Sequence, residues 1–421
     1  MNNSGIIVVV NSIAKHNNAD KLQIVHIFGT QVITGLDTKA GDLMIYFDSN
    51  LKLSTEYLKE HNLYRHSELN KDKNEVGYFE ENGRVKAIKL RGEFSDGVLM
   101  PIDSLAFTGK IDKLVQGFEF NDFNGVKICE KYIPITKTPG LPREKKNSGR
   151  KTPKSPMFVE HWDTGQFFKN QHVIPAHTIL YIEEKVHGTS GRIGNVIVET
   201  SNERNWFQRF LMTKICGIKS TWVYRCIHGS RRVTFNDPDK KYNHFHDPTM
   251  REKVLEKVTG LLDKGQEIYF ELYGYEATGA EIQKGFPYGC VAKPVLGDTT
   301  SKQYKTLLYR VTMNNEDGKV IDYSREYVYG KADELGLEKP YLFEKVYYDG
   351  TEESMKSLEE KVVNYAQGQS ELDKNTLKEG VVIWFINNKG NWEALKYKQD
   401  AFRLKESSNK DKGIIDQEDI N

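Results

Sequence analysis

Residues 177–194 read HTILYIEEKVHGTSGRIG, and this stretch combines a strand pattern, a lysine and a turn. Its first half alternates apolar and polar side chains, which predicts a half-buried strand that ends near Glu184. Lys185 follows at once, and the chain then turns at Gly188, Thr189 and Ser190. Glycine and short hydroxyl side chains let a phosphate approach the backbone, so the stretch can present a lysine to a phosphate.

A lysine followed three residues later by glycine is weak evidence on its own, because the pattern recurs at Lys89, Lys214 and Lys257. Only Lys185 combines an upstream strand with a downstream Gly-Thr-Ser turn. A nucleophilic lysine must also lose its proton near neutral pH, which requires burial or nearby cations. We therefore predict that Lys185 is a nucleophile.

Three later segments supply the groups that such a lysine needs. In EIYFELYG (267–274), alternation directs Glu271 to the face opposite the apolar side chains, so the strand can carry it into a cleft. Glu379 precedes an apolar strand at 380–386, and EALKYK (393–398) directs Lys396 and Lys398 to one face. Each segment also has an ordinary explanation, as a half-exposed strand, a turn or a charged edge strand. Together they offer two carboxylates for a divalent ion and two lysines for a triphosphate. Their order and residue types make coincidence improbable, so we favour a catalytic site over the ordinary explanations.

The first 135 residues differ in pattern, with short strands, frequent turn residues and one helix predicted at 54–62. A small closed antiparallel sheet, such as an OB-like barrel, is the economical interpretation. One short strand region is crowded with basic residues and predicts contacts with phosphates, with a solvated strand face as the alternative: Arg84, Lys86, Lys89 and Arg91.

Between the two patterns, TKTPGLPREKKNSGRKTPKSP (136–156) is rich in proline and in basic residues and predicts an extended linker. We therefore expect an α+β protein with four parts: an N-terminal OB-like barrel (1–135), a basic linker (136–160), a large domain of antiparallel sheets flanked by helices (161–405), and an acidic tail that frays (406–421). In the large domain the strongest strands are predicted at 178–184, 267–273, 306–313, 380–386 and 392–397, and helices at 250–262 and 352–365.

Composition narrows the class of protein. The 421 residues carry a formal net charge of +1, which argues only weakly against a nucleic-acid partner because binding depends on where charges lie. We see no run near the roughly 18 apolar residues of a membrane span, and no secretory signal. The four cysteines form no paired pattern. We expect a monomer in the cytoplasm, a reducing compartment, with no membrane partner. Spacing also argues against a zinc site among Cys216, Cys226, His228, His244 and His246.

The order of the four chemical segments resembles that of the covalent nucleotidyltransferase superfamily of polynucleotide ligases and capping enzymes. KVHGTS (185–190) resembles the nucleophile motif of ATP-dependent RNA ligases, in the branch of the second RNA ligase of phage T4 and the trypanosome editing ligases. Capping enzymes and DNA ligases usually carry Asp where His187 stands. FELYG, EGVVI and LKYK continue the resemblance over about 160–405. NADKLQ, AGDLMIYFDSN, VKAIKLRGEFSDGVLMP and KICEKYIP are similar to the N-terminal OB domain of the Naegleria and Deinococcus type of RNA ligase.

The resemblance implies a role for each matching residue. Lys185, with His187 beside it, would be catalytic: its amine would attack the α-phosphate of ATP and form lysyl-AMP. The nucleotide would be bound by Glu184, Val186, Ser190, Arg204, Glu271, Tyr309, Lys396 and Lys398. Mg²⁺ or Mn²⁺ would be bound by Glu271 and Glu379. The N-terminal domain (1–135) would bind RNA, through Arg84, Lys86, Lys89 and Arg91. The match around Tyr309 departs from the family, because Arg310 stands where an acidic residue is usual.

The implied activity is the sealing of RNA with 3′-OH and 5′-phosphate ends, a duplex nick among the candidates, through lysyl-AMP and RNA-adenylate in RNA repair. A DNA ligase or a GTP-dependent capping enzyme is the first alternative; both usually carry the OB domain after the catalytic domain. A catalytically dead nucleic-acid-binding homologue is the second alternative, and the intact set of lysines and glutamates argues against it.

Overall fold

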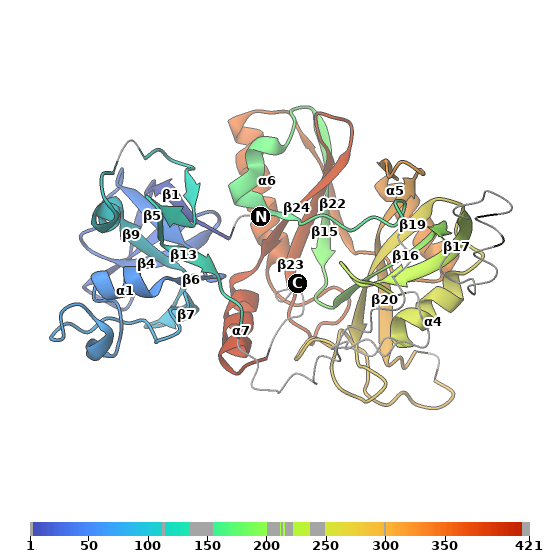
Figure 1. Ribbon diagram of the computed structural model, residues 1–421, viewed down its shortest axis with the longest axis horizontal. Helices are drawn as coiled ribbons and strands as arrows, with labels where there is room; N and C mark the ends of the chain where they lie inside the picture. Colours follow the sequence, from blue (N-terminus) through green and yellow to red (C-terminus); the bar gives the residue numbers. More distant parts are fainter. Residues whose placement is uncertain are drawn as a thin grey trace. The chain divides into compact units, whose positions relative to one another are not determined.

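The computed structural model describes residues 3–111, 114–134, 155–199, 211, 214, 222–235, 249–298 and 300–414 (Figure 1). The chain has an α+β fold and divides into two compact units. Unit 1 comprises Met1–Ile135, Phe167–Lys169 and Lys398–Ile415, and unit 2 comprises Thr136–Gln166, Asn170–Tyr397 and Asp416–Asn421. Phe167–Lys169, which we predicted in the large domain, therefore belongs to the first unit, and so does Lys398–Ile415, which we divided between the large domain and the tail. Most of the predicted basic linker lies outside the described residues.

Unit 1 is built from short antiparallel strands. The four-stranded sheet has the order β10-β1-β5-β9, and smaller sheets pair β2-β3-β4, β7-β8, β6-β13 and β11-β12. The bounds are β1 Gly5–Val9, β2 Ile13–Lys15, β3 Leu22–Ile27, β4 Thr30–Gly35, β5 Leu43–Phe47, β6 Leu51–Leu53, β7 Ala87–Leu90, β8 Glu93–Asp96, β9 Val98–Pro101, β10 Glu119–Phe120, β11 Asp122–Phe123, β12 Val126–Lys127 and β13 Cys129–Lys131. The predicted helix is α1 (Thr55–Glu60), which begins where the Ser54 side chain accepts a hydrogen bond from the Tyr57 N–H.

The apolar run in β1 is buried because its two faces pack into two cores. Ile7 packs with Ile45 and Phe47 in one cluster. Ile6 and Val8 belong to a second cluster on the other face. A strand that is buried on both sides shows a continuous apolar run instead of alternation, which is the pattern of this segment.

The C-terminal helix α7 (Asp400–Asp411) belongs to unit 1 and corrects the prediction of a fraying tail from residue 406. Phe402 is fully buried on its inner face. Arg84, also buried, donates to Asp411 Oδ1 over 2.7 Å and to the Ser407 carbonyl over 3.2 Å. Arg403 of the helix forms an ion pair with Asp96. These contacts hold a segment whose polar composition alone suggested disorder.

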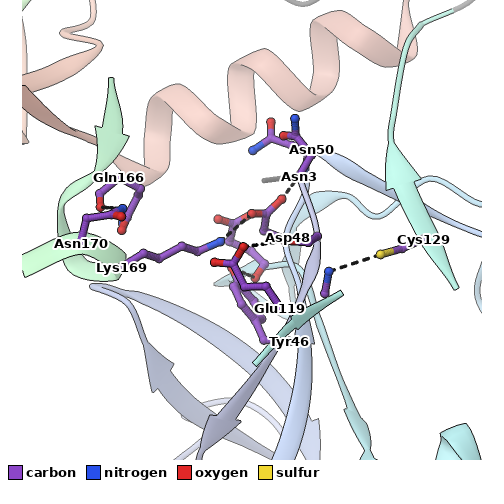
Figure 2. A network of polar contacts seen from close by, with 12 residues as sticks. Asn3, Tyr46, Asp48, Asn50, Glu119, Cys129, Gln166, Lys169 and Asn170 are labelled. Atoms are coloured by element: carbon purple, nitrogen blue, oxygen red, sulfur yellow. Dashed lines mark hydrogen bonds and ion pairs between the residues drawn. The ribbon is translucent and has the colours of Figure 1, made fainter. Parts of the chain in front are cut away.

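The segment Phe167–Lys169 is fastened to the end of β5 by a polar network (Figure 2). Asp48 accepts hydrogen bonds from Lys169 Nζ over 2.9 Å and from the Asn50 N–H over 3.0 Å. Lys169 Nζ also lies 5.6 Å from the ring centroids of Phe28 and Tyr46. Burial by itself would raise the pKa of Asp48, but the Lys169 ammonium lowers it below its ordinary value.

Unit 2 contains two sheets. The five-stranded sheet has the order β14-β24-β23-β15-β22, and the six-stranded sheet has the order β18-β17-β16-β19-β20-β21. The bounds are β14 Gly165–Gln166, β15 Thr178–Lys185, β16 Thr189–Glu199, β17 Trp222–Gly229, β18 Thr234–Phe235, β19 Gln266–Gly274, β20 Tyr304–Asn314, β21 Val320–Asp322, β22 Leu342–Tyr348, β23 Gly380–Ile386 and β24 Trp392–Lys398. All five predicted strands are confirmed to within two residues. The structure adds the long strands β16, β17 and β22 and the short strands β14, β18 and β21.

Helices flank the sheets of unit 2, and their bounds are α4 Thr249–Val258, α5 Arg325–Leu335 and α6 Glu352–Ala366. The short helix α2 (Phe167–Asn170) belongs to unit 1 except for its last residue. The helix predicted at 250–262 thus ends earlier, and α5 was not predicted. The main core lies between the six-stranded sheet and two of these helices, where Ile268 and Phe270 of β19 meet Val254 of α4 and Val328 of α5. Among the described residues, no helix is long and apolar enough to cross a membrane.

The strand pair β15 and β16 explains where chemistry can occur. The two strands are consecutive in sequence, yet β15 belongs to the five-stranded sheet and β16 to the six-stranded sheet. The three residues between them, 186–188, therefore carry the chain from one sheet to the other. Lys185 is the last residue of β15 and lies at this crossing.

Candidate active site

A pocket at the crossing, here called the Lys185 pocket, is lined by side chains from both sheets of unit 2. Glu184 and Lys185 of β15 line it together with Glu271 of β19, Tyr309 of β20 and Lys396 of β24. Segments that are far apart in the sequence thus converge at Lys185, and the structure brings together five of the residues that we predicted for the site. Val186 and Ser190 also line the pocket.

The Lys185 amine is paired with Glu379. In the antiparallel ladder between β15 and β23, Lys185 stands opposite Gly380, which places Glu379 at the same end. The distance from Lys185 Nζ to Glu379 Oε2 is 2.9 Å; the lysine side chain is 20% exposed and the glutamate side chain 1%. A buried carboxylate that contacts the amine can hold the proton that a nucleophilic lysine must lose.

His187 contacts the same carboxylate from the turn. Its Nδ1 lies 3.8 Å from Glu379 Oε2, and its backbone N–H donates to the Tyr288 hydroxyl over 2.9 Å. The imidazole packs edge-on against the Phe286 ring, with centroids 5.0 Å apart. His187 is therefore held by aromatic residues next to the Lys185–Glu379 pair.

Glu271 holds the turn that follows the lysine. Its Oε1 accepts the Gly188 N–H and its Oε2 accepts the Ser190 hydroxyl, both over 3.0 Å. The β16–β19 register, with Ser190 opposite Glu271, brings these groups together. A Cβ on Gly188 would lie 2.2 Å from the Leu272 carbonyl oxygen, so only glycine fits. The predicted face of Glu271 is confirmed, since Leu272 belongs to the core and Glu271 lines the pocket.

Arg251 of α4 also fixes this turn, and sequence reasoning missed it. Its guanidinium is buried and donates to Thr189 Oγ1 over 2.8 Å and to the Ser190 carbonyl over 2.9 Å. Burial lowers the pKa of Arg251 to about 10, and the nearby Glu271 carboxylate opposes that shift. The sequence carries no signal for this contact, because an arginine in a predicted surface helix is usually solvated.

The two glutamates before Lys185 have different environments. Glu183 receives two hydrogen bonds from Arg325, over 2.8 and 2.6 Å, and is part of a buried ion pair. Glu184 Oε2 accepts the Glu371 N–H over 2.8 Å, whereas the buried Oε1 has no hydrogen-bond partner among the described residues. Burial raises the pKa of Glu184. A buried acceptor without a partner is costly, and a ligand donor in the pocket would satisfy it.

Aromatic side chains also line the pocket. Tyr309 lies edge-on to His161, with centroids 5.2 Å apart, and Trp384 lines the same pocket. Arg310, the departure from the family pattern, is paired with Asp322 and its guanidinium lies 3.7 Å from the centroid of Trp162. Arg231 is a second pocket residue that the sequence did not reveal; it is paired with Asp163.

Several predicted residues have other environments. Lys396 lines the pocket, but its predicted partner Lys398 does not line it; the Lys398 amine lies 3.5 Å from Glu406. The reason is that β24 ends at Lys398 and the chain continues into α7. Arg204 lies outside the described residues. Among the residues that the structure describes, no group of three or more histidine, cysteine or acidic side chains could hold a metal.

The four basic residues of unit 1 that we predicted to bind RNA differ in exposure. Arg84 is 2% exposed and bonded to α7, so its guanidinium is not presented to a phosphate. Lys86 is half-buried and lies 3.2 Å from Asp411. Lys89 and Arg91 are exposed at the end of β7.

Comparisons with known proteins agree with this architecture. A family model described as an OB-fold domain matches residues 6–102. Solved structures of an RNA ligase from Naegleria gruberi resemble the whole chain: a mutant with ATP and Mn (TM-score 0.56, 15% identity, 96% of this chain and 98% of that chain), an apo mutant (0.59, 15%, 97% and 100%) and a form with PPi (0.58, 16%, 97% and 100%). A search of curated proteins gives no significant match. The predicted N-terminal OB domain and the RNA-ligase fold are thus confirmed.

Proposed function

We propose that this protein is an ATP-dependent RNA ligase that seals 3′-OH and 5′-phosphate RNA ends through lysyl-AMP and RNA-adenylate. One observation carries the proposal: Lys185 lines a pocket together with Glu271, Tyr309 and Lys396, and its amine lies 2.9 Å from the buried Glu379 carboxylate. The likeness to the Naegleria gruberi enzyme supports it, since those structures hold ATP and Mn, AMP and Mn, or PPi.

In the first step Lys185 Nζ attacks the α-phosphorus of ATP. A phosphorus–nitrogen bond forms, the bond to the bridging oxygen of pyrophosphate breaks, and pyrophosphate leaves with the electron pair. The attacking amine must first be neutral, and Glu379 Oε2 is placed to hold its proton. Lys396 in the pocket wall neutralises charge on the phosphates. Glu271 and Arg251 keep the turn after Lys185 in one conformation, so the approach of the amine is preorganised.

A divalent ion, Mg²⁺ or Mn²⁺, fits the donor set. Mg²⁺ is usually bound by one or two carboxylates together with phosphate oxygens of the substrate, and Glu379 and Glu271 are hard oxygen donors of this kind. Such an ion supplies positive charge that offsets the charge of the phosphates. Glu379, which contacts Lys185, and Glu271, which holds the turn after it, are the two candidate ligands, and Glu379 would bind the ion in its deprotonated form.

Adenine is the base we expect in the pocket. Tyr309 supplies an aromatic surface for stacking, and Val186 an apolar contact. Glu184 Oε1, buried and without a partner among the described residues, can accept a hydrogen bond from an amino group such as N6 of adenine. Guanine presents no amino group at that position, which favours ATP over GTP and so argues against a capping enzyme.

AMP then passes from Lys185 to the 5′-phosphate of RNA, and the adjacent 3′-OH attacks the adenylated end and expels AMP. We propose that the OB-fold unit binds this RNA, with Lys89 and Arg91 among the contacts, and that a duplex nick is one substrate. We also propose that the protein acts in RNA repair, as a monomer in a reducing, intracellular compartment. Phosphoryl transfer of this type needs positioning and charge neutralisation above all.

Incubation with α-labelled ATP or GTP and Mg²⁺ or Mn²⁺, followed by a denaturing gel, tests the proposal. Label from ATP on wild type and on Lys356→Ala, an exposed lysine of α6, with none on Lys185→Ala, is the expected result. Label that persists in Lys185→Ala, or an unlabelled wild type, would overturn it. Sealing of a nicked RNA duplex but not of nicked DNA separates an RNA ligase from a DNA ligase.

A further inference from the structure

A second concave site in unit 2, here called the lysine pocket, has no assigned role. Four lysines line it: Lys253 and Lys257 of α4, Lys302 just before β20, and Lys305 within β20. Among its described lining residues Glu338 is the only carboxylate. Four ammonium groups around one hollow repel one another unless an anion lies between them, so the site is built for a strongly negative ligand.

The contacts of the four amines show which of them are available. Lys257 Nζ donates to the Gly336 carbonyl over 2.5 Å, and Lys305 Nζ lies 3.7 Å from Glu338 Oε1. Lys253 and Lys302 are exposed, and neither amine has a hydrogen-bond or ion-pair partner among the described residues. Two amines are therefore held in place by the protein, and two are left to a ligand.

The lysine pocket shares a wall with the Lys185 pocket. On β20, Thr306 lines the lysine pocket and Leu307 lines the Lys185 pocket. The segment after α5 does the same, with Glu338 in one and Pro340 in the other. The two segments are joined by a hydrogen bond of 2.9 Å from the Glu338 N–H to the Thr306 carbonyl. Two residues on a strand span about 7 Å, so the Cα atom of Lys305 lies about 7 Å from that of Leu307, which lines the Lys185 pocket.

We propose that the lysine pocket binds backbone phosphates of the RNA whose end reaches Lys185. The inference rests on the proposed function and adds a binding site outside the OB-fold unit. A free polyphosphate shares the same chemistry, but a shared wall with the reaction pocket favours a polymer that must lie beside it. Lysine–phosphate contacts position a strand without reading its sequence, so the site would act on any RNA.

Lys253→Glu/Lys302→Glu tests the proposal in the full-length protein, because these two amines make no contact with described residues that folding needs. Lys319→Glu/Lys356→Glu is the matched control: it changes two exposed lysines of the same unit by the same charge. RNA affinity is measured by fluorescence anisotropy from 0.05 to 0.3 M salt. Lysyl-AMP formation and thermal melting are measured for each variant.

The lysine-pocket variant should bind RNA about tenfold or more weakly than the control at 0.1 M salt. Its plot of log affinity against log salt should be shallower by about 1 to 2, because two phosphate contacts are lost. Lysyl-AMP formation should stay within about twofold of wild type. Equal affinity and equal salt slope in the two double variants would overturn the proposal.

Two further outcomes are distinguishable. If wild type forms no lysyl-AMP, the proposed function fails, while the RNA-binding comparison still decides the lysine pocket. Calorimetric titration with sodium tripolyphosphate tests the other source of phosphate. Binding of tripolyphosphate that is tighter than binding of RNA and is lost in the lysine-pocket variant would assign the pocket to a free polyphosphate and overturn the RNA assignment.

Discussion

Glu267 makes the stability of unit 2 depend on pH near neutrality. It lies in β19, four residues before Glu271 on the same strand, and is fully buried. Its Oε2 accepts the Val159 N–H over 3.0 Å and the Asn314 side-chain amide over 2.7 Å. Its Oε1 has no hydrogen-bond partner among the described residues, and Arg192 Nη1 is 3.9 Å away from it. Burial raises the pKa of Glu267 from the ordinary 4.5 to about 7.

The sign follows from proton binding. Between pH 4.5 and about 7 the folded protein keeps a proton on Glu267 that the unfolded chain has released. Raising the pH through this window therefore destabilises the folded state, and stability from this group is complete only below about pH 4.5. One pKa unit is worth about 1.4 kcal/mol, so the loss amounts to about 3 kcal/mol by pH 8.

Glu267→Gln removes the titration and keeps an oxygen that can accept from Val159 and Asn314. We expect the free energy of unfolding of wild type to fall by about 2.5 kcal/mol more than that of the variant between pH 5 and pH 8. Urea titrations followed by tryptophan fluorescence measure it, because all five tryptophans lie within the residue ranges of unit 2.

Glu316→Gln, an exposed change at the turn after β20, is the control and should keep the pH dependence of wild type. Parallel pH profiles for wild type and Glu267→Gln would refute the reasoning. In that case the carboxyl group would be solvated or fully paired with Arg192, and its burial would not shift its titration.

Three further predictions concern the turn after Lys185 and the C-terminal helix. Gly188→Ala should lower lysyl-AMP formation more than about 100-fold, because the added Cβ would overlap the neighbouring strand. Gly330→Ala in α5 is the control, since a Cβ there meets nothing within 4 Å. It should leave labelling intact and raise stability by about 1 kcal/mol. Arg251→Met should lower the rate of lysyl-AMP formation by about 10- to 100-fold with little change in the KM for ATP, since it removes hydrogen bonds that position the turn; an equal rise in KM would point to a binding role instead. Asp411→Ala should speed amide hydrogen exchange across α7 about tenfold, because buried Arg84 loses an ion-pair partner, and unchanged exchange would show that the pair does not hold the helix.

Sequence patterns predicted a segment correctly where the two-residue alternation of a strand dominated it. The strand 178–184 and the alternation around Glu271 were predictable, because a pleated strand directs alternate side chains to opposite faces. It failed for α7 and for Lys398. A polar helix that is stabilised by an ion pair with Arg84, more than 300 residues earlier in the chain, leaves no local signal. For the same reason we predicted that Arg84 binds RNA, whereas it is buried and bonded to α7.

The sequence by itself determined which residues can do chemistry: a lysine at the end of a strand, a glycine-containing turn after it, two glutamates and Lys396. These follow from local order, since strand period and turn chemistry depend on neighbouring residues. Only the tertiary structure decided which of them meet. The crossing of the chain from one sheet to the other at 186–188, the antiparallel register that sets Glu379 against Lys185, and the contact of Arg251 with Ser190 all join segments that are distant in sequence. Such contacts depend on how sheets and helices pack in space, which no local pattern encodes.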